Sequence, residues 1–404
     1  MRTWSALLVG LVMAVGVISG SLFVPRAEGA TAVKVCGSGY GHGVGLSQWG
    51  AYGRAKAGQG YAWIVKAYYR GVTLKTFSTN PAVRVLLGSK SLGGSHDVAV
   101  HSGSKARLRN LATGGTVALG PGVYRVEYLS DKKLYRVTNI SAGKTVGSFT
   151  GPVVFEPVSG GPLGYGGKNY RGTLKAQVSG SGFLLVNGLG LESYVRGVVP
   201  NEMYTSWPQA ALRSQAVASR SYARAATRSG SYDLTLGDEA YGGASSETAA
   251  TNKAVAATAR VAAVYDGKAI TAFYSASAGG YTEDSAYVFS ASPYLKAVKD
   301  VDSSGHTFES RVNSPWTHWS GVLDPNGSPE LGVGSITGVS VLDRSPSGRA
   351  TKVAVTGTNG KTTISGEYNV RSHLESTGLR RADGSRFSAG DLPSARVSFG
   401  SACG

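Results

Sequence analysis

Short runs that alternate apolar and polar residues fill the middle of the chain. Between residues 82 and 187 they read AVRVLL, ARLRNL, TVALG, GVYRVEYL, KLYRVTNI, TVGSFTG, PVVFEPV and GFLLVNGL. Runs rich in β-branched and aromatic residues, parted by Gly, Ser, Asn and Asp, are typical of β-strands, so we predict an all-β region of roughly eight strands. The glycine-rich GGPLGYGG at 160–167 is interpreted as a loop within it.

Helical patterns flank this region. AYGRAKAGQGYAWIVKAYYRG (51–71) predicts two short helices broken at Gly58 to Gly60. LESYVRGVV (191–199) predicts a helix that ends before Pro200. Ser206 is the expected N-cap of the helix in WPQAALRSQAVASRSYARAATRSG. One face of that helix carries residues small enough for close packing: Leu212, Ala216, Ser219 and Ala223.

The last part of the chain mixes both patterns. Residues 248–258 predict another helix, and RVAAVYDGKAITAFYSAS predicts a hairpin through its Asp-Gly step. SITGVSVLDRSPSGRATKVAVTGTNGKTTISG predicts a β-meander. The pattern as a whole favours an α+β fold.

The N-terminus adds an export signal. Arg2 precedes an apolar run from Leu7 to Ile18, and small residues follow up to Ala30, which is the layout of a cleaved signal peptide over residues 1–30. An uncleaved membrane anchor is the alternative, although the run is short for a full span. We expect no membrane span after signal cleavage.

The net charge and the cysteines indicate which partners and which redox compartment suit the chain. The formal net charge is +17, which for an exported chain favours anionic cell-wall polymers over nucleic acid, although a basic surface without a particular partner gives the same composition. Cys36 and Cys403 are the two cysteines of the chain. An even pair in an oxidising compartment favours a disulfide, here closing nearly the whole mature chain into a ring.

Several familiar motifs fail on single residues. GYGHGVGLSQWGAYGRAKAGQG (39–60) has Leu46 where a dinucleotide-binding GxGxxG needs glycine, and Trp49 where a GxSxG elbow needs glycine. TNGKTT (358–363) has Val355 in place of the first glycine of a phosphate-binding loop, so a hairpin turn is favoured. The six histidines are scattered without ligand spacing, so we expect no metal site and no cofactor.

Glu202 is the main candidate for acid–base chemistry. It follows Pro200 among apolar residues and near Trp207, a setting that can desolvate a carboxyl group and raise its pKa enough to donate a proton. A helix-capping role explains it equally well. Glu192 competes with it, but lies in the first turn of its helix, where the dipole favours a negative charge.

The residues around Glu202 resemble the SpoIID/LytB family of sporulation stage II protein D glycan-cleaving proteins and amidase enhancers. The resemblance rests on 191–223, on 251–289 followed by PYLKAV, on SGRATKVAVTG with SGEYNVRSHL, and on GHGVGLSQWGA followed by AYYRGVTL. It implies an α+β fold, with a mixed helical and β-meander core and a β-rich inserted subdomain. It also implies a peptidoglycan lytic transglycosylase, in which one carboxyl group acts as acid and then base. The family's catalytic position falls on Glu202.

The resemblance also implies residues that line a glycan groove. The positions carried over are Gln215, Arg220, Tyr241, Ser275, Ser277, Gly279, Gly280, His42, Ser47 and Gln48. Arg220 has two open roles, either neutralising a muramic carboxylate or charge near Glu202, or forming a salt bridge within the helix packing. Trp207 and Tyr241 either stack on sugars or pack in the core.

The chain departs from the family pattern in three respects. The stretch YDLTLGDEAYGG (232–243) lacks the Cys and His that accompany zinc in some members. Glu239 stands where the family often has glutamine, and YSASAGG (274–280) replaces a serine-richer form. GHGVGLSQWGA also lies near the N-terminus instead of the C-terminus, as in a circular permutation. We hypothesise that a Cys36–Cys403 disulfide restores the connection that the permutation removes.

The expected division is a signal peptide (1–30), an N-terminal segment of the core (31–80), a β-rich subdomain (81–187) and the main catalytic region (188–404). Two functions stay open. One is an exported lytic transglycosylase that acts on peptidoglycan strands; the other is a non-catalytic, wall-binding enhancer of a cell-wall amidase. The expected partners are glycan strands, anionic wall polymers and such an amidase. A nucleic-acid partner is disfavoured, because the chain carries an export signal and no recognition motif.

Overall fold

The computed structural model describes residues 32–159, 161–226, 230–387 and 390–403. The predicted signal peptide therefore lies outside the described residues. The chain forms two compact units: unit 1 combines residues up to Trp49 with Ser275–Gly404, and unit 2 is Gly50–Tyr274. The boundary falls inside the short strand β19 (Tyr274–Ser275).

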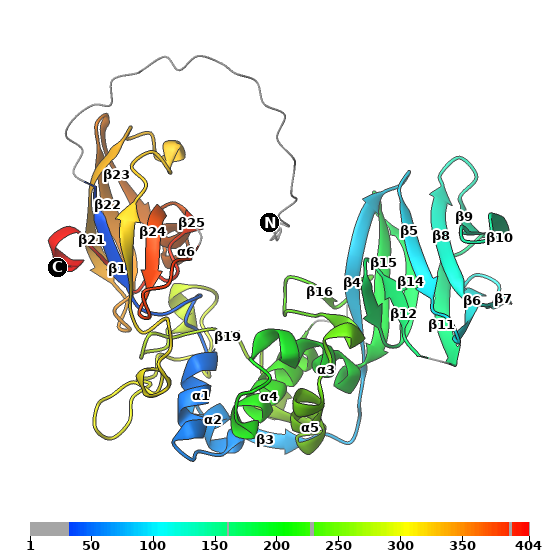
Figure 1. The fold of residues 1–404 in the computed structure, drawn as a ribbon, viewed down its shortest axis with the longest axis horizontal. Coiled ribbons are helices and arrows are strands. Elements are labelled where there is room, and N and C mark those ends of the chain that lie inside the picture. The colour runs from blue at the N-terminus through cyan, green and yellow to red at the C-terminus, as the bar shows by residue number, and fades with distance from the viewer. Residues whose placement is uncertain (1–31, 160, 227–229, 388–389, 404) are drawn as a thin grey trace. The chain divides into compact units, whose positions relative to one another are not determined.

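The predicted β region forms twelve strands of unit 2, where roughly eight were expected, and the last of them extends to Gly190. They are β4 (Ala82–Ser91), β5 (Ser95–Val100), β6 (Lys105–Asn110), β7 (Thr116–Leu119), β8 (Gly122–Leu129), β9 (Leu134–Asn139), β10 (Lys144–Phe149), β11 (Val153–Ser159), β12 (Leu163–Tyr165), β13 (Lys168–Tyr170), β14 (Thr173–Ser179) and β15 (Gly182–Gly190). Strand β16 (Leu234–Thr235) joins them by pairing with β4 in parallel. Two sheets result, ordered β16-β4-β15-β14-β11-β6-β7 and β10-β9-β8-β5-β12-β13 (Figure 1).

The two sheets share an aromatic core. The ring of Phe183 on β15 lies 5.0 Å from that of His96 on β5, and His96 Nε2 lies 3.0 Å from the Phe183 carbonyl oxygen. Phe155 and Phe183 are fully buried, as expected for inward-facing positions of packed sheets.

Three helices of unit 2 pack against α4 (Gln209–Ala225), and α1 (Gln48–Lys56) begins at the boundary between the units. The three helices are α2 (Tyr61–Tyr68), α3 (Leu191–Glu202) and α5 (Ala249–Ala257), and unit 2 also contains the turn η1 (Gly243–Ser246). A small sheet orders β18 (Lys268–Ala269), β17 (Val261–Tyr265) and β3 (Thr73–Thr76). Helix α4 contacts α2, α3, α5 and β17. The predicted small-residue face of α4 is confirmed, because Leu212, Ala216, Ser219 and Ala223 are all fully buried.

Unit 1 contains two further sheets (Figure 1). The first orders β25 (Gly390–Asp391), β24 (Glu375–Arg381), β20 (Trp319–Leu323), β1 (Lys34–Gly37) and β26 (Val397–Phe399). The second is the predicted meander of β21 (Ile336–Arg344), β22 (Ala350–Gly357) and β23 (Gly360–Ser365). Helix α6 (Glu367–Ser372), strand β2 (Leu46–Ser47) and the turns η2 (Ser285–Tyr287), η3 (Ser310–Val312), η4 (Pro329–Leu331) and η5 (Gly400–Cys403) complete it. Trp319 and Val35 lie in its buried apolar core.

Three local predictions are wrong. Residues 163–170 form a hairpin instead of a loop, because Gly166 and Gly167 both take the positive φ angles that a tight turn needs. Helix α3 continues through Pro200 to Glu202, since the Met203 N–H still bonds the Val199 carbonyl. Ser206 does not cap α4, whose N-cap is Pro208 with no side-chain cap.

The two units do not follow the expected domain boundaries at 80/81 and 187/188. Strand β16 joins the sheet of β4, and helix α3 follows β15 directly, so the β-rich residues and the helices fold together in unit 2. Strand β1 pairs with β20 and β26, which ties the N-terminal segment to residues after 275 within unit 1. No helix among the described residues is long and apolar enough to cross a membrane.

Candidate functional site

Glu202 closes helix α3 and is partly buried. The Ala240 N–H donates a hydrogen bond of 2.7 Å to Glu202 Oε1, which orients the carboxyl group. Its neighbour Asn201 fixes the same turn, because Asn201 Nδ2 donates to the Gly197 carbonyl at 2.7 Å and to Ser246 Oγ at 3.0 Å. The helix end and the loop that contains Ala240 are therefore held together around this carboxyl group.

Glu239, the residue before Ala240, carries a second carboxyl group in the same region. Its residue is only 3% exposed, and the Tyr274 hydroxyl donates a hydrogen bond of 3.0 Å to Glu239 Oε1. Burial raises the pKa of Glu239 to about 8; the hydrogen bond from Ser219 opposes this rise and the negative charge of Glu202 adds to it. This raised pKa favours the protonated form of Glu239 at neutral pH and couples its titration to the charge of Glu202.

The aromatic residues near Glu202 divide into core and surface. Trp207 is buried and stacks on Tyr52, with ring centroids 4.7 Å apart and planes 10° apart. Tyr241 is buried and donates a hydrogen bond of 2.8 Å to Asn187 Oδ1. Tyr204 is 65% exposed and lies two residues after Glu202. Core packing thus accounts for Trp207 and Tyr241, whereas Tyr204 offers an accessible ring.

Arg220 forms a salt bridge within the helix packing, which is one of the two roles considered for it. Its Nε and Nη2 bind Glu192 Oε1 and Oε2 at 2.8 and 2.9 Å, and Nη1 donates to the Ala216 and Val261 carbonyls. The residue is 1% exposed. The guanidinium is therefore committed to Glu192 inside the helix packing. Gln215 is also fully buried on α4, where its Nε2 donates to Ser219 Oγ at 3.1 Å.

A different acidic residue organises the site residues of unit 1. Ser47 Oγ donates to Glu309 Oε1 at 2.6 Å, Ser277 Oγ donates to Glu309 Oε2, and the Ala278 N–H donates to Oε1 at 2.9 Å. Ser47, Ser277 and Glu309 have no exposed surface. Burial raises the pKa of Glu309 to about 7, with the charge of Asp300 adding to it. The two serines are thus joined by a buried carboxyl group, not displayed to solvent.

The segments that carry Ser47 and Ser277 are joined by their backbones as well. Tyr40 and Ser277 exchange backbone hydrogen bonds at 2.9 and 3.1 Å, and the Trp49 N–H donates to the Ala276 carbonyl at 2.9 Å. His42 Nδ1 accepts from the Val44 N–H at 3.0 Å. The glycine-rich segment 39–49 and the segment 275–280 therefore form one folded piece of unit 1.

Glycine is required where these segments meet. Gly279 and Gly280 have φ angles of 64° and 87°. A Cβ on Gly279 would lie 2.7 Å from Ser38 Oγ, and a Cβ on Gly280 would lie 2.5 Å from Thr307 Cγ2. A Cβ on Gly43 would meet the buried Arg349 guanidinium at 2.2 Å. Close packing explains these glycines without a ligand.

The disulfide lies in the same unit. Cys36 and Cys403 are joined, with Cα atoms 5.5 Å apart. Cys36 lies on β1, which pairs with β26, and Cys403 ends the turn that follows β26. The bond thus links two segments that already neighbour each other in the sheet.

The predicted site residues fall into two groups. Unit 2 holds Glu202, Gln215, Arg220 and Tyr241; unit 1 holds His42, Ser47, Gln48, Ser275, Ser277, Gly279 and Gly280. Gln48 and Ser275 are buried. A single groove built from both groups stays a prediction. Sequence reasoning did not select Glu239, Glu309 or Tyr204, although Glu239 was visible as an unusual acidic residue in YDLTLGDEAYGG. Among the described residues, no group of three or more His, Cys, Asp or Glu side chains is placed to hold a metal ion.

Comparison with known proteins identifies the region around Glu202. Residues 179–265 match the SpoIID family, described as stage II sporulation protein. An uncharacterized protein of Brachyspira hyodysenteriae is 34% identical over 180 residues, which cover 43% of this chain and 47% of that protein. The amidase enhancer of Bacillus subtilis is 47% identical over 108 residues, which cover 26% of this chain and 15% of that protein. The chain thus matches less than half the length of each of these curated relatives.

Proposed function

We propose that this chain is an exported lytic transglycosylase of peptidoglycan, because residues 179–265 match the SpoIID family. Its substrate is the bond between N-acetylmuramic acid and N-acetylglucosamine. Glu202, which lies inside the matched residues, is the general acid and base. The observation that carries the proposal is the Glu202 carboxyl group itself, fixed by Ala240 at the end of α3 and beside the exposed Tyr204.

The reaction requires two proton transfers, one from Glu202 and one back to it, and the two protons are different. Glu202 first donates its proton to the oxygen that links the two sugars, so that this bond breaks and the N-acetylglucosamine hydroxyl leaves. The carboxylate then takes the proton from the 6-hydroxyl of the muramic acid as that oxygen closes a 1,6-anhydro ring. No water is consumed, and the substrate supplies the nucleophile. A second catalytic carboxylate of the kind found in most glycosidases is therefore unnecessary.

The surroundings of Glu202 suit this role. The hydrogen bond from Ala240 fixes the direction of the carboxyl group, which general acid catalysis requires. Burial raises the pKa of Glu239 to about 8, which favours its neutral form in the segment between β16 and η1 whose Ala240 N–H bonds Glu202. Tyr204 presents an exposed ring on which a sugar can stack, since pyranose faces pack on aromatic side chains.

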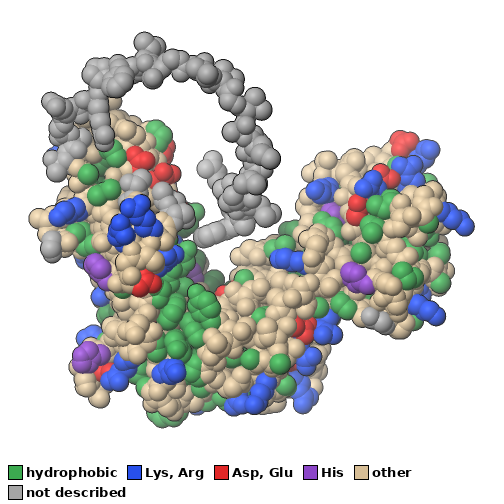
Figure 2. Space-filling model, viewed as in Figure 1, with side chains coloured by type: hydrophobic (Ala, Val, Ile, Leu, Met, Phe, Trp, Pro, Cys, Tyr) green, Lys and Arg blue, Asp and Glu red, His purple; other side chains and the backbone are tan. Residues whose placement is uncertain are grey.

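The positive net charge of the chain is consistent with a substrate in the cell wall. The formal net charge of +17 favours contact with anionic wall polymers. On the face drawn in Figure 2, Lys and Arg side chains occur over both units instead of gathering at one place. The proposed location is therefore outside the cytoplasmic membrane, at the cell wall.

A second candidate function is enhancement of a cell-wall amidase without catalysis. The observation that favours it is the similarity, 47% over 108 residues, to a protein named amidase enhancer. Both functions require a surface that binds glycan strands. They differ in whether the carboxyl group of Glu202 transfers a proton.

One experiment with purified wall glycan distinguishes the transglycosylase from the amidase enhancer. The wild type and Glu202→Gln are incubated with the wall alone and with a purified N-acetylmuramoyl-L-alanine amidase. Release of glycan fragments by the wild type alone, lost in Glu202→Gln, supports the transglycosylase. If neither protein releases fragments while both raise the rate of the amidase equally, the chain is an enhancer.

A further inference from the structure

A cavity of about 400 Å³ lies in unit 1, and apart from the disulfide residue Cys36 its lining contains none of the site residues assigned above. It forms at the end of three neighbouring strands, where Gly37 of β1 pairs with Trp319 of β20 and with Val397 of β26. Its volume lies in the range of roughly 300–1,000 Å³ that is typical of small-molecule sites. The cavity is therefore large enough for a sugar-sized or polyol-sized group.

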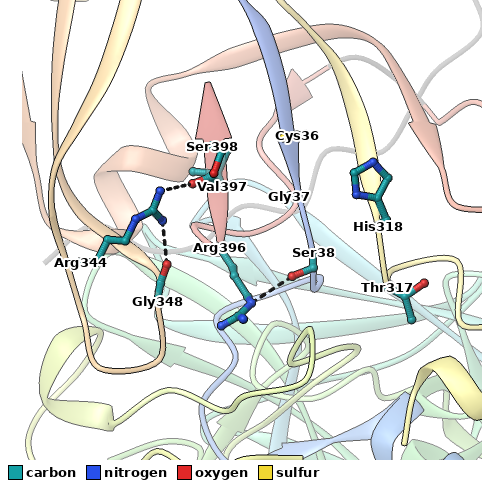
Figure 3. A pocket seen from close by; sticks show the side chains of 10 residues that line it. All are labelled: Cys36, Gly37, Ser38, Thr317, His318, Arg344, Gly348, Arg396, Val397 and Ser398. Atoms are coloured by element: carbon teal, nitrogen blue, oxygen red, sulfur yellow. Dashed lines mark hydrogen bonds between the residues drawn. The ribbon is translucent and has the colours of Figure 1, made fainter. Parts of the chain in front are cut away.

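The lining is rich in cations and hydrogen-bond donors. Arg344, Arg396 and His318 border the cavity, together with the hydroxyl groups of Ser38, Thr317 and Ser398 (Figure 3). None of the described residues that line it is Asp or Glu. Nor does either arginine form an ion pair with a carboxylate in the part of the chain that the structure describes. Two guanidinium groups thus border one cavity, and neither is in direct contact with a carboxylate of the described residues.

Both guanidinium groups are held in place by neutral oxygens. Arg344 Nη1 and Nη2 donate to the carbonyls of Gly348 and Val397 at 2.8 and 3.0 Å. Arg396 Nε donates to Ser38 Oγ at 3.1 Å, and Nη1 donates to the Ser347 carbonyl. In the view of Figure 3, the side chain of Arg396 lies between those of Arg344 and His318. Because a guanidinium has five N–H groups, each arginine keeps further donors for an anion.

The electrostatics agree with this geometry. Burial lowers the pKa of Arg396, and the positive charges of Arg349 and Arg344 lower it further, while Glu283 and Glu309 act weakly in the opposite direction. Burial also lowers the pKa of Arg344. The lowered pKa values mean that the charged form of each arginine is less stable here than in water. A bound anion would stabilise that charged form.

We propose that this cavity binds a phosphoryl group carried by a small polyol or sugar. Bidentate arginines suit phosphate and carboxylate alike, but the donors here come from several strands and directions. The hydroxyl groups of Ser398 on β26, of Thr317 just before β20 and of Ser38 just after β1 line the same cavity as the two guanidinium groups. A tetrahedral phosphoryl group presents oxygens in enough directions to meet them, whereas a planar carboxylate does not. This site does not depend on the role proposed for Glu202.

The test measures binding by calorimetry to the full secreted chain at constant ionic strength. The probes are inorganic phosphate, a short poly(glycerol phosphate), and glucuronate as the carboxylate of similar size. The main variant is Arg344→Gln, because Arg344 is exposed, so we expect the variant to fold as the wild type does, which circular dichroism should verify. Arg136→Gln on β9 is the matched control, since it removes one positive charge from an exposed position elsewhere.

We expect the phosphate probes to bind and Arg344→Gln to weaken them by about tenfold or more, as loss of a charge-assisted hydrogen bond implies. Arg136→Gln should change the affinity by less than about twofold, because Arg136 does not line the cavity and its exposed charge is screened by salt. Tighter binding of poly(glycerol phosphate) than of inorganic phosphate supports a phosphoryl group carried by a polyol, whereas tighter binding of inorganic phosphate contradicts a polyol carrier and indicates a site for the free ion. Equal weakening by both variants, or tighter binding of glucuronate than of either phosphate probe, overturns the proposal.

Discussion

The buried carboxyl group of Glu239 accepts a hydrogen bond from the hydroxyl group of Tyr274 at 3.0 Å, next to the loop that orients Glu202. A carboxyl group with a pKa of about 8 in the folded chain and about 4.5 when exposed links folding to pH. Below the lower value both states are protonated. Between the two values the folded chain keeps a proton that the unfolded chain has lost, so stability falls as pH rises.

Glu239→Gln should remove this pH dependence, because the amide resembles the protonated acid and does not titrate. In the wild type, Glu239 contributes a slope of at most about 1.4 kcal/mol per pH unit between pH 4.5 and 8. Urea unfolding at several pH values, followed by a probe in unit 2, measures that slope. Glu127→Gln, at a partly exposed carboxylate on β8, is the control and should leave it unchanged. An unaltered slope in Glu239→Gln would show that Glu239 is ionised at neutral pH.

Glu309 should be essential for the folded state of unit 1. Glu309→Ala removes the acceptor of two buried serine hydroxyls and a backbone N–H, so we expect a loss of roughly 3 kcal/mol or more of stability. Glu309→Gln keeps one carbonyl acceptor and should cost less than half as much. Hydrogen exchange over residues 39–49 and 275–280 localises the effect. Equal stability of both variants and the wild type would contradict a structural role.

Helix α3 depends on the ion pair between Glu192 and Arg220. Glu192→Ala leaves a guanidinium that is 1% exposed without its carboxylate, and breaking such a pair typically costs roughly 3–5 kcal/mol. Glu192→Ala combined with Arg220→Met removes the stranded charge and should recover part of the loss. Chemical denaturation of the single and double variants measures the coupling. A double variant less stable than Glu192→Ala alone would mean that Arg220 stabilises the fold by contacts other than the ion pair.

The disulfide should act on unit 1 alone. Cys36 and Cys403 are separated by 367 residues, so their bond restricts a very long loop of the unfolded chain. Replacing both by serine should lower the stability of unit 1 by about 2–5 kcal/mol, the range that is typical of native disulfides in small secreted domains. Hydrogen exchange in β1 and β26 should increase, while that in α4 stays as in the wild type. Unchanged exchange in β1 and β26 would show that their backbone pairing suffices.

Local sequence patterns predicted the elements whose signals are local. The break at Gly58 to Gly60 separates α1 from α2, and the Asp266–Gly267 step makes the β17–β18 turn with positive φ at both residues. The hairpin at 163–170 has the same kind of signal in Gly166 and Gly167. It was predicted as a loop because the surrounding glycines concealed the two short strands.

Most contacts of the candidate site could not be predicted from the sequence, because they join residues that are far apart along the chain. Glu309 meets Ser47 across 262 positions and Ser277 across 32, so no spacing along the chain reveals their contact. Burial of Ser47, Ser277 and Gln215 likewise results from tertiary packing that residue type does not specify. Glu202 could be selected because its setting, after Pro200 and before Trp207, is local.

The central claim is that Glu202 drives cleavage of glycan strands with ring closure. Its most direct measurement is the chemistry of the new chain ends after incubation of purified glycan strands with the wild type, Glu202→Gln and the control Glu127→Gln. We predict fragments that end in 1,6-anhydro-N-acetylmuramic acid and resist borohydride reduction, formed equally by the wild type and the control. Glu202→Gln should form them at least about a hundredfold more slowly, as expected for loss of a general acid. Reducible ends would indicate hydrolysis instead, and full activity of Glu202→Gln would contradict the assignment of Glu202.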